Sequence, residues 1–334
     1  PYSEEQLYLL LRYRPLYGML DSVGQVVVPV TYLRVGTYQE DRLAVQDTLG
    51  RWGFLGRSGE MVVACAYQKV RAYREGMAAY CSKYRWGYCD HAGEVVTKAE
   101  YIRCGDFSEG KAWVQMAGNR RGYVNKQGVV LFDGRYSILT DFHQGRAGVK
   151  VSGKGWGIVD PTGAYILAPS KRYKKILPFN KHGLAFVKVG KKYRLINRAG
   201  DWVGKRRYGT IRPYSEGIAV VRYQRLQGFH IGPRNRKWVL IDTAGEAVTK
   251  EQFRYVRSFK EGRACFRGDD GRFGYLDRQG AVAIAPQYLK ATDFEDNRAV
   301  VFQRYDQSGV LDTAGRVILE VAYNRIEDHR HGYA

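Results

Sequence analysis

The stretch WGFLGRSG at residues 52–59 has four close relatives in the same chain. They are WGYCDHAG at 86–93, GWGIVDPTG at 155–163, KWVLIDTAG at 237–245 and RFGYLDRQG at 272–280. The glycine that ends each stretch belongs to a series with steps of 34 to 37 residues, apart from one step of 45. The series is Gly24, Gly59, Gly93, Gly128, Gly163, Gly200, Gly245, Gly280 and Gly315. A fixed period of this length is typical of a repeat protein.

Two further landmarks keep the same period. An aromatic residue follows most of these turn glycines by eight positions, and the series is Tyr32, Tyr67, Tyr101, Tyr136, Tyr208, Phe253, Tyr288 and Tyr323, with Tyr173 displaced by two residues. The third landmark, aromatic-x-Glu-Gly-x-Ala, appears at 73–78, 107–112, 214–219 and 259–264. We therefore expect a single array over residues 1–334. Its nine predicted units are approximately 1–37, 38–72, 73–106, 107–141, 142–178, 179–213, 214–258, 259–293 and 294–328, followed by the start of a tenth.

Within a unit, the pattern predicts β-strands joined by tight turns. RAVVFQ at 298–303 and GVLDTAGRVIL at 309–319 are short β-rich runs with polar breaks between them. An acid that begins a turn can accept from the backbone N–H two residues on, and the turn glycine supplies the positive φ. The residues at this place are Asp21, Asp90, Asp160, Asp242, Asp277 and Asp312, with Asn125 and Asn197 as equivalents and Gly56 as the exception. A calcium ladder is the alternative, but each turn brings one acid and Ca²⁺ needs several oxygens, so we expect turn capping.

The aromatic residue of the motif recurs once per unit. The series is Tyr17, Trp52, Trp86, Trp156, Tyr193, Trp238 and Phe273, with Arg121 and Ser308 as departures. We expect these rings to pack on one another between units as a structural seam. Stacking platforms for sugars or bases are the alternative. The glycine after the ring, which Arg194 and Val239 replace in two units, is expected to admit a neighbouring backbone or ring.

These motifs resemble those of the WG-repeat (formerly KWG) family of bacterial proteins. The resemblance lies in RWGFLGRSGEMVV, RWGYCDHAGEVVT, GWGIVDPTGAYILAP and RFGYLDRQGAVAIAPQY, each followed by text like FSEGKAWV, and it covers essentially the whole chain. It implies an all-β repeat scaffold that serves as an interaction module and has no agreed activity. With three or four short antiparallel strands per unit, we expect stacked hairpin units forming a superhelix or a propeller-like ring.

Composition narrows the possible functions. The chain has 54 Lys and Arg against 33 Asp and Glu, a net charge of +21, which favours acidic macromolecules as partners. Five cysteines without a CxxC pair leave the redox compartment open, and we expect free thiols with Cys89 and Cys104 buried. No apolar stretch is long enough to cross a membrane. The six histidines lack metal-ligand spacing, and no nucleophile or nucleotide-binding motif is present. We therefore expect no catalytic residue, no metal and no cofactor.

Basic residues recur at fixed places in the repeat. One set follows the landmark aromatic by two positions and consists of Arg34, Lys69, Arg103, Lys175, Lys290 and Arg325. Another set lies just before the motif aromatic and consists of Arg51, Arg85, Arg120, Lys192, Lys237 and Arg272. Equivalent residues of stacked units line up, so each set is expected to form a basic stripe that attracts acidic partners. The alternative is that these residues keep strand edges from pairing with other molecules.

The long step between Gly200 and Gly245 contains an inserted loop at residues 223–238. Long loops on a rigid scaffold are often functional, although a tolerated insertion costs little. The loop residues that we expect to bind a partner are Arg225, Phe229, His230, Arg234, Arg236 and Lys237.

From these observations we expect a non-catalytic binding scaffold whose basic surface engages an acidic partner. A protein in a bacterial assembly, possibly of the envelope, is the first expectation, because no RNP or helix-turn-helix signature is present. Nucleic-acid binding is the alternative, and an enzyme without a recognisable motif is the distant third. The location, in the envelope, periplasm or cytoplasm, stays open.

Overall fold

The computed structural model describes residues 15–21, 23–223, 237–249 and 253–323. These residues form β-strands throughout, apart from one short 3₁₀ turn, η1 (Ala117–Asn119). The predicted all-β array of antiparallel hairpin sheets is therefore confirmed. The chain divides into two compact units, Pro1–Lys171 and Arg172–Ala334.

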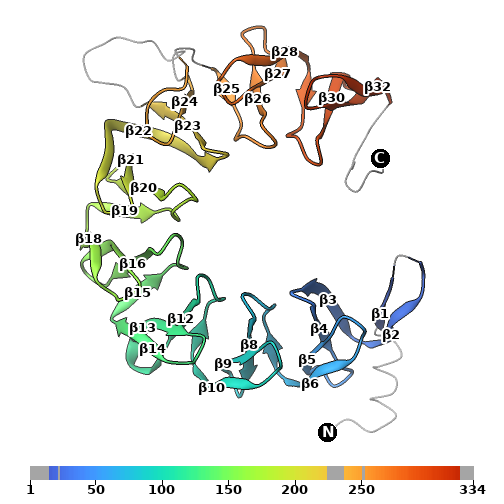
Figure 1. Ribbon diagram of the computed structural model, residues 1–334, viewed down its shortest axis with the longest axis vertical. Helices are drawn as coiled ribbons and strands as arrows, with labels where there is room; N and C mark the ends of the chain where they lie inside the picture. The colour runs from blue at the N-terminus through green and yellow to red at the C-terminus, as the bar shows by residue number, and fades with distance from the viewer. Residues whose placement is uncertain (1–14, 22, 224–236, 250–252, 324–334) are drawn as a thin grey trace. The chain divides into compact units, whose positions relative to one another are not determined.

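The first unit contains five sheets in chain order (Figure 1). The first sheet has two strands, β1 (Tyr17–Leu20) and β2 (Val26–Tyr32). The next comprises β3 (Arg34–Gln39), β4 (Arg42–Gln46), β5 (Trp52–Leu55) and β6 (Met61–Tyr67). It is followed by β7 (Lys69–Val70), β8 (Met77–Ser82), β9 (Arg85–Asp90) and β10 (Val95–Tyr101). The last two comprise β11 (Arg103–Cys104), β12 (Lys111–Gln115), β13 (Arg121–Asn125) and β14 (Val130–Gly134), and then β15 (Tyr136–Leu139), β16 (Ala147–Val151), β17 (Gly155–Val159) and β18 (Tyr165–Ser170).

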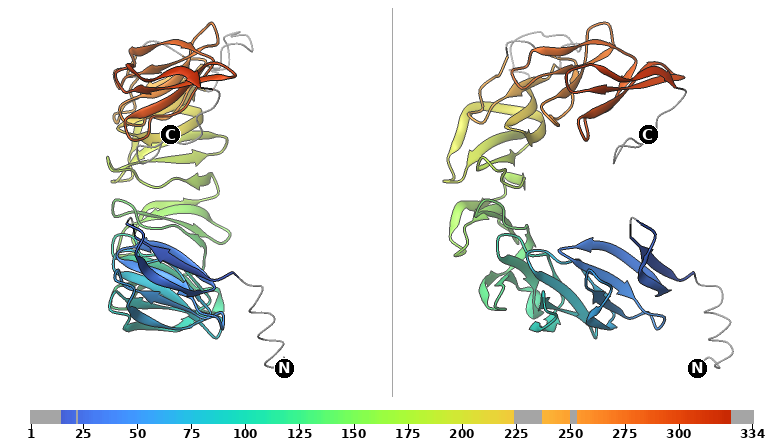
Figure 2. Two further views of the ribbon diagram at one scale, coloured as in Figure 1. Left: turned by 90° about the vertical axis from the view of Figure 1, so that its right-hand side faces the viewer. Right: turned by 45° about the vertical axis from the view of Figure 1, so that its right-hand side comes forward.

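The second unit contains three sheets within its described residues, and Figure 2 shows the strands of both units from two further directions. The first has six strands, β19 (Tyr173–Ile176), β20 (Leu184–Val189), β21 (Lys192–Asn197), β22 (Trp202–Ser215), β23 (Ile218–Tyr223) and β24 (Val239–Ile241). The others comprise β25 (Tyr255–Val256), β26 (Ala264–Arg267), β27 (Phe273–Leu276) and β28 (Val282–Tyr288), and then β29 (Lys290–Ala291), β30 (Arg298–Arg304), β31 (Gln307–Asp312) and β32 (Val317–Tyr323). In every sheet each strand pairs with the next along the chain, so each sheet is an antiparallel meander.

The motif aromatic and the landmark aromatic lie opposite each other on adjacent strands. Trp52 of β5 pairs with Tyr67 of β6, and the next pair along is Phe54 with Val63. Three residues of β6 therefore lie opposite the single residue Gly53, which is a β-bulge larger than the usual two-to-one kind. A β-carbon on Gly53 would lie 2.4 Å from the carbonyl oxygen of Val63. The expectation that the motif glycine admits a neighbouring backbone is confirmed, and the bulge explains the fixed spacing between the two aromatic residues.

The predicted turn chemistry is confirmed. In the turn after β1, Asp21 Oδ1 accepts from the backbone N–H of Val23 at 3.0 Å and of Gln25 at 2.8 Å. Gly24 has a φ of 85°, and its N–H donates to the Asp21 carbonyl at 3.2 Å. The same acid-to-backbone bonds recur at Asp90, Asn125, Asp160, Asn197, Asp242, Asp277 and Asp312.

Gly56 is the exception in this series, because it has no side chain to accept from the turn. The carboxylate of Glu60, in the same turn, takes its place. A β-carbon on Gly56 would fall on the carboxylate of Glu60. That carboxylate accepts from the Ser58 backbone N–H at 3.2 Å and from the Ser58 hydroxyl at 2.6 Å. Hydrogen bonding from Ser58 accordingly lowers the pKa of Glu60.

The core between consecutive sheets is built from a different aromatic pair than the one predicted. Tyr88, two places after Trp86, is fully buried and packs edge-on against Phe107 of the next sheet, with ring centroids 4.9 Å apart. The Tyr88 hydroxyl donates to the Gly105 carbonyl at 2.7 Å. Equivalent pairs are Phe54–Tyr73, Tyr123–Phe142 and Tyr275–Phe294, each at 4.8 Å.

The expectation of a ring-on-ring seam between the motif aromatics is therefore wrong. Among the described residues, no ring contact joins two motif aromatics. Trp86 is only partly buried and covers the edge of a cluster that includes Tyr88 and Val114. Trp86 and Tyr88 lie on the same face of β9, because they are two places apart in the strand, but only Tyr88 is fully buried, whereas Trp86 lies nearer the start of the strand.

The Glu of the third landmark links each turn to the next. Glu75 lies in a two-residue hairpin loop at a φ of 52°, followed by Gly76 at 78°, the combination that a type I′ turn requires. Its carboxylate accepts from the backbone N–H groups of Glu109 and Gly110, both at 2.7 Å. The same forward bonds run from Glu40 to 75–76, from Glu109 to 144–145, from Glu216 to 262 and from Glu261 to 297.

The sheets are offset from the predicted units by one strand. The unit predicted at 73–106 supplies β8, β9 and β10 to one sheet and β11 to the next. The sequence period shows where the repeats recur but not where the chain leaves one sheet for another. A second difference lies at β22, which pairs with β21 along 202–208 and with β23 along 208–215, so two predicted units share one six-stranded sheet.

Candidate binding surface

The excess positive charge is concentrated in the second unit. Residues 1–171 contain 22 basic and 16 acidic residues, whereas residues 172–334 contain 32 and 17. The segment 172–212, which forms β19 to β22, contains thirteen Lys and Arg and one acid, Asp201. The exposed members are Arg172, Lys174, Lys175, Lys181, Lys191, Arg198, Lys205, Arg206 and Arg207. We call β19–β22 the basic sheet face.

A bulge presents three of these cations together. Tyr193 of β21 pairs with Tyr208 of β22, and Leu195 pairs with Val203. Residues 204–207 therefore lie opposite the single residue Arg194, one residue more than lie opposite Gly53 and Gly87. Arg194 stands where the motif glycine would be, and a longer bulge makes room for its side chain. The result is that 205–207, Lys-Arg-Arg, project from the middle of a strand with all three side chains exposed.

The aromatic rings on this face are already covered. The Arg194 guanidinium lies 4.1 Å from the Trp202 ring centroid, and the Tyr173 ring lies 6.2 Å from the same ring. Lys188 Nζ lies 5.6 Å from the Tyr193 ring. Burial and the nearby charge of Arg207 lower the pKa of Arg194. Cation–π contacts of this kind hold the basic side chains against the sheet.

The predicted row of cations lies on the first strand of the sheets. Arg34, Lys69, Arg103 and Lys290 each begin an edge strand, Lys175 lies within β19, and all five are exposed. None of the five forms an ion pair with a described residue. Arg325 lies outside the described residues. In the first unit, the row is interrupted at β15, where Ile138 occupies the position.

The inserted loop lies mostly outside the described residues, and with it Arg225, Phe229, His230, Arg234 and Arg236. The strands on either side of it pair directly, since Ala219 of β23 faces Ile241 of β24. Of the predicted residues, Lys237 is described and partly buried. Its neighbour Trp238 is buried and exchanges two backbone hydrogen bonds with Phe253, at 2.6 and 2.9 Å.

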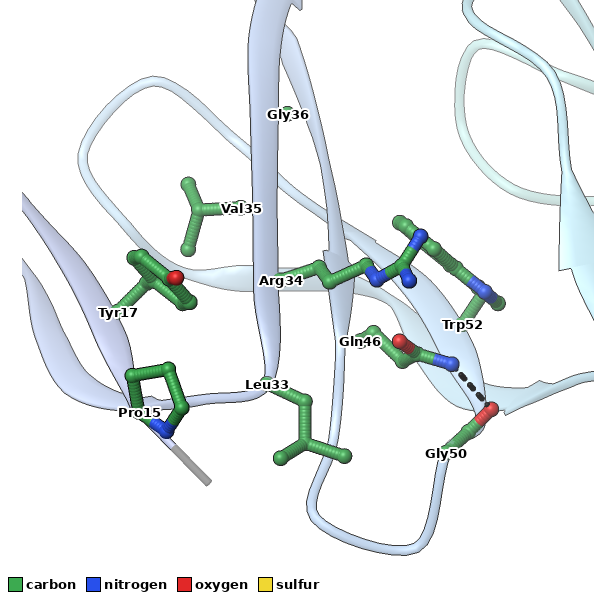
Figure 3. Close-up of a pocket in the computed structure, with 9 residues that line it drawn as sticks. All are labelled: Pro15, Tyr17, Leu33, Arg34, Val35, Gly36, Gln46, Gly50 and Trp52. Atoms are coloured by element: carbon green, nitrogen blue, oxygen red, sulfur yellow. Dashed lines mark hydrogen bonds between the residues drawn. The ribbon is translucent and has the colours of Figure 1, made fainter. Parts of the chain in front are cut away.

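A cavity of about 630 Å³ lies in the first unit between the two-stranded sheet and the next one. Figure 3 shows its walls, with Tyr17 on one side and the Arg34 side chain extending toward Trp52 on the other. Gln46 lies between them and donates from Nε2 to the Gly50 carbonyl at 2.8 Å. The cavity thus combines a motif aromatic of one sheet with a cation of the following sheet.

A smaller cavity of about 200 Å³ occupies the equivalent place in the second unit. Phe273 corresponds to Tyr17, Lys290 corresponds to Arg34, and Phe302 corresponds to Gln46. The repeat therefore leaves an opening beside the motif aromatic at more than one junction. This arrangement was not expected, because the motif aromatic was placed in the interior.

The family model for the WG containing repeat matches residues 52–84, 86–119, 122–154, 156–193, 193–224 and 273–305, more than half of the chain. The chain belongs to the WG containing repeat family. No curated protein matches it.

Several solved structures align with most of this WG-repeat chain at low identity. A crystal structure of the eukaryotic initiation factor aligns over 86% of this chain and 85% of its own, with 12% identity and a TM-score of 0.49. BamB from Moraxella catarrhalis aligns over 87% and 88%, with 10% identity and a TM-score of 0.36. Apo AztD from Citrobacter koseri aligns over 86% and 94%, with 12% identity and a TM-score of 0.35.

The WG repeats carry one further column of residues that the sequence reasoning missed. Four places after the landmark aromatic, Arg71 and Arg257 each form an ion pair with an Asp of the following repeat. Arg71 Nε lies 2.7 Å from Asp106 Oδ1, and Arg257 Nη1 lies 3.3 Å from Asp293 Oδ1. A column-by-column comparison of the repeats would have found it, because each Asp directly precedes the aromatic of the third landmark.

Arg212 lies at the same position of its repeat, four places after Tyr208, but the following repeat has no Asp at the corresponding place. The residue that corresponds to Asp106 and Asp293 is Ser258. Instead of a carboxylate, the Arg212 guanidinium faces two rings, 5.1 Å from the Trp238 centroid and 5.4 Å from that of Tyr255. Its Nε is buried and has no hydrogen-bond partner among the described residues.

Burial keeps several thiol groups of these WG repeats protonated. Burial raises the pKa of Cys104 and of Cys265 to about 12, and it raises the pKa of Cys89. All five cysteines are free thiols, and Cys89 and Cys104 are buried as expected. In the described ranges, no group of three or more His, Cys, Asp or Glu is placed to hold a metal ion. In the same ranges, no helix is long and apolar enough to cross a membrane.

Proposed function

We propose that this WG-repeat protein is a non-catalytic binding scaffold that engages an acidic segment of another protein through its basic sheet face. The observation that carries the proposal is the thirteen-to-one ratio of basic to acidic residues in 172–212, a segment that forms consecutive strands. A surface with one sign of charge raises the rate and affinity of association with an oppositely charged partner. We place this interaction in a bacterial assembly at the envelope.

We propose no catalytic step, because burial holds candidate thiol nucleophiles in their protonated form. A thiol acts as a nucleophile when it is a thiolate, and burial keeps the pKa of Cys104 and Cys265 near 12. The strand sites of these thiols give them a packing role.

Nucleic-acid binding is the second candidate, and the aromatic residues on the basic sheet face favour it. Proteins that bind single strands stack bases on exposed rings. Here Trp202 lies beneath Arg194 and beside Tyr173, which leaves less ring surface for a base. Because the Trp202 ring is covered in this way, we favour a protein partner over a nucleic acid.

The test compares two triple charge reversals. Lys174→Glu, Lys205→Glu and Arg207→Glu change the basic sheet face, whereas Lys83→Glu, Arg85→Glu and Lys98→Glu change the charge equally in the first unit. We expect the first variant to bind fluorescein-labelled hexaglutamate at least about tenfold more weakly, and the second to stay near the parent. Equal losses in both variants would show that only total charge matters and would refute the assignment of the face.

The nucleic-acid alternative is separated by salt dependence. The parent is titrated with a single-stranded DNA of equal length at several salt concentrations, because phosphate contacts give a steep linear slope of log affinity against log salt. Tighter binding of DNA than of hexaglutamate at physiological salt would favour the second candidate.

A further inference from the structure

We infer that Arg212 is a receptor for a carboxylate of the bound partner, at a place where the repeat has lost its own acid. The inference rests on the proposed function and deepens it, because it names one atom group of the partner and one residue that takes it.

The comparison within the chain carries the argument. In two other repeats, the arginine of this column is neutralised by an Asp one repeat further on, Arg71 by Asp106 and Arg257 by Asp293. At Arg212 the acid is replaced by Ser258, and no ion pair forms within the described residues. Of the three described repeats with an arginine in this column, the one at Arg212 is alone in having no Asp opposite it. Asp106 and Asp293 in the two other repeats show that a carboxylate fits beside the arginine of this column.

The surroundings keep the position intact without the acid. Ser215 Oγ donates to the Phe259 carbonyl at 2.6 Å, as Ser108 Oγ donates to the Phe142 carbonyl at 2.7 Å in the first unit. The turn that carries Ser258 is therefore held against β22 by the same kind of bond that Ser108 forms with the turn at Phe142. The residue before Phe259 thus keeps its place, and only its side chain has changed.

The unmet hydrogen-bonding capacity points to an anion. A guanidinium has five N–H donors in a planar fork that matches a carboxylate. The Arg212 Nε is buried without an acceptor, which is costly unless a ligand supplies one. The Trp238 and Tyr255 rings stabilise the charge but accept no strong hydrogen bond.

A second cation adds to the same place. The Arg222 guanidinium lies 5.2 Å from the Trp238 centroid, and its Nη2 donates to Thr210 Oγ1 at 2.9 Å. Two guanidiniums therefore contact one indole ring, and neither forms an ion pair with a described residue. Their combined potential favours a negatively charged group over a neutral amide.

The decisive experiment restores the missing acid. Ser258→Asp should create the ion pair seen at Asp106 and Asp293 and so occupy Arg212 from within the chain. We expect hexaglutamate to bind this variant on the order of tenfold more weakly, since one charge-assisted bidentate pair is withdrawn. The melting temperature should not fall. Ser258→Asn is the matched control of the same shape without charge, and it should bind like the parent.

A site-specific readout accompanies the affinity. The ¹H–¹⁵N signal of Arg212 Nε–H, assigned by its loss in Arg212→Lys, should shift on titration of the parent with hexaglutamate and not shift in Ser258→Asp. Equal affinity of Ser258→Asp and parent, together with an unmoved signal, would overturn the inference. If single-stranded DNA shifts this signal at a lower concentration than hexaglutamate does, then the group that Arg212 binds is a phosphate and not a carboxylate. That result would overturn the inference as well.

The two proposals fail differently. If the charge reversals at Lys174, Lys205 and Arg207 weaken binding but Ser258→Asp does not, then the basic sheet face stands and the Arg212 site falls. If Ser258→Asp removes binding and the reversals do not, then the Arg212 site stands and the face falls. No binding of hexaglutamate to the parent would contradict both.

Discussion

A β-carbon on Gly87 would lie 2.5 Å from the carbonyl oxygen of Thr97 on the neighbouring strand. The contact is backbone against backbone, so no side chain can move aside. The same approach occurs at the motif glycines Gly18, Gly53, Gly122, Gly157, Gly274 and Gly309. The glycine of the motif is therefore required by the close approach of the backbone of the following strand.

Gly87→Ala should lower the free energy of unfolding by about 1–3 kcal/mol, the usual range for an overfilled site. Gly148→Ala is the control, because its nearest neighbours would be at 3.4 Å, an ordinary contact. Chemical denaturation of both variants measures the difference. A Gly87→Ala protein as stable as Gly148→Ala would show that the bulge adapts freely.

The two aromatic residues of the motif should differ in their contribution to stability. Tyr88 is fully buried between sheets, so Tyr88→Ala is expected to cost about 3–5 kcal/mol. Trp86 is partly buried at the end of the row, so Trp86→Ala should cost clearly less, about 1–2 kcal/mol after scaling for its exposure. Thermal melts of the two variants would establish the order, and a larger effect at Trp86 would contradict the core described above.

Glu75→Gln should weaken the link between adjacent repeats. The amide keeps one acceptor oxygen but places an NH₂ group toward backbone N–H donors, so one of the bonds to Glu109 and Gly110 is lost. The expected loss is about 1 kcal/mol in the free energy of unfolding. Glu94→Gln provides the control, because the Glu94 side chain is exposed and forms no hydrogen bond with a described residue. Equal denaturation midpoints for the two variants would mean that the link contributes nothing.

Alkaline pH should destabilise the fold. An unfolded thiol ionises near pH 9, whereas the pKa of Cys104 and of Cys265 is raised by burial to about 12. Between these values the unfolded chain has released protons that the folded chain retains. The free energy of unfolding should therefore fall with rising pH, by up to about 1.4 kcal/mol per pH unit for each thiol. Melting temperatures measured from pH 8 to 11 test the slope, and Cys104→Ser should reduce it.

Much of the local structure could be predicted because it is repeated and short-range. The acid that begins each turn and the glycine that ends it interact within five residues, so Asp21 and Gly24 reveal their roles in sequence. The core was harder to predict. Both Trp86 and Tyr88 recur with the same period and lie on the same face of β9, so the sequence does not show which of the two rings the next sheet covers.

The candidate site shows the limits of the same reasoning. The repeat spacing predicts Arg34 and Lys69 as binding residues, but the run of cations in 172–212 does not follow that spacing and was not predicted. The absence of an acid at Ser258 has no motif of its own. It becomes visible only when Arg71 and Asp106 are known to touch, 35 residues apart in the sequence.

The carboxylate bonds between turns also have a direction. Glu40 reaches the turn at Glu75, and Glu75 reaches the turn at Glu109, always toward the C-terminal neighbour. In a duplicated repeat inserted between them, the turn N–H groups would donate to the Glu of the preceding repeat, and the Glu of the inserted repeat would accept from the turn of the next one. Gene duplication can therefore lengthen the array without new kinds of contact. An insertion in a loop is compatible with these bonds, since Glu216 accepts from Gly262 across the longer step between Gly200 and Gly245. The same contact can therefore serve an array with any number of repeats.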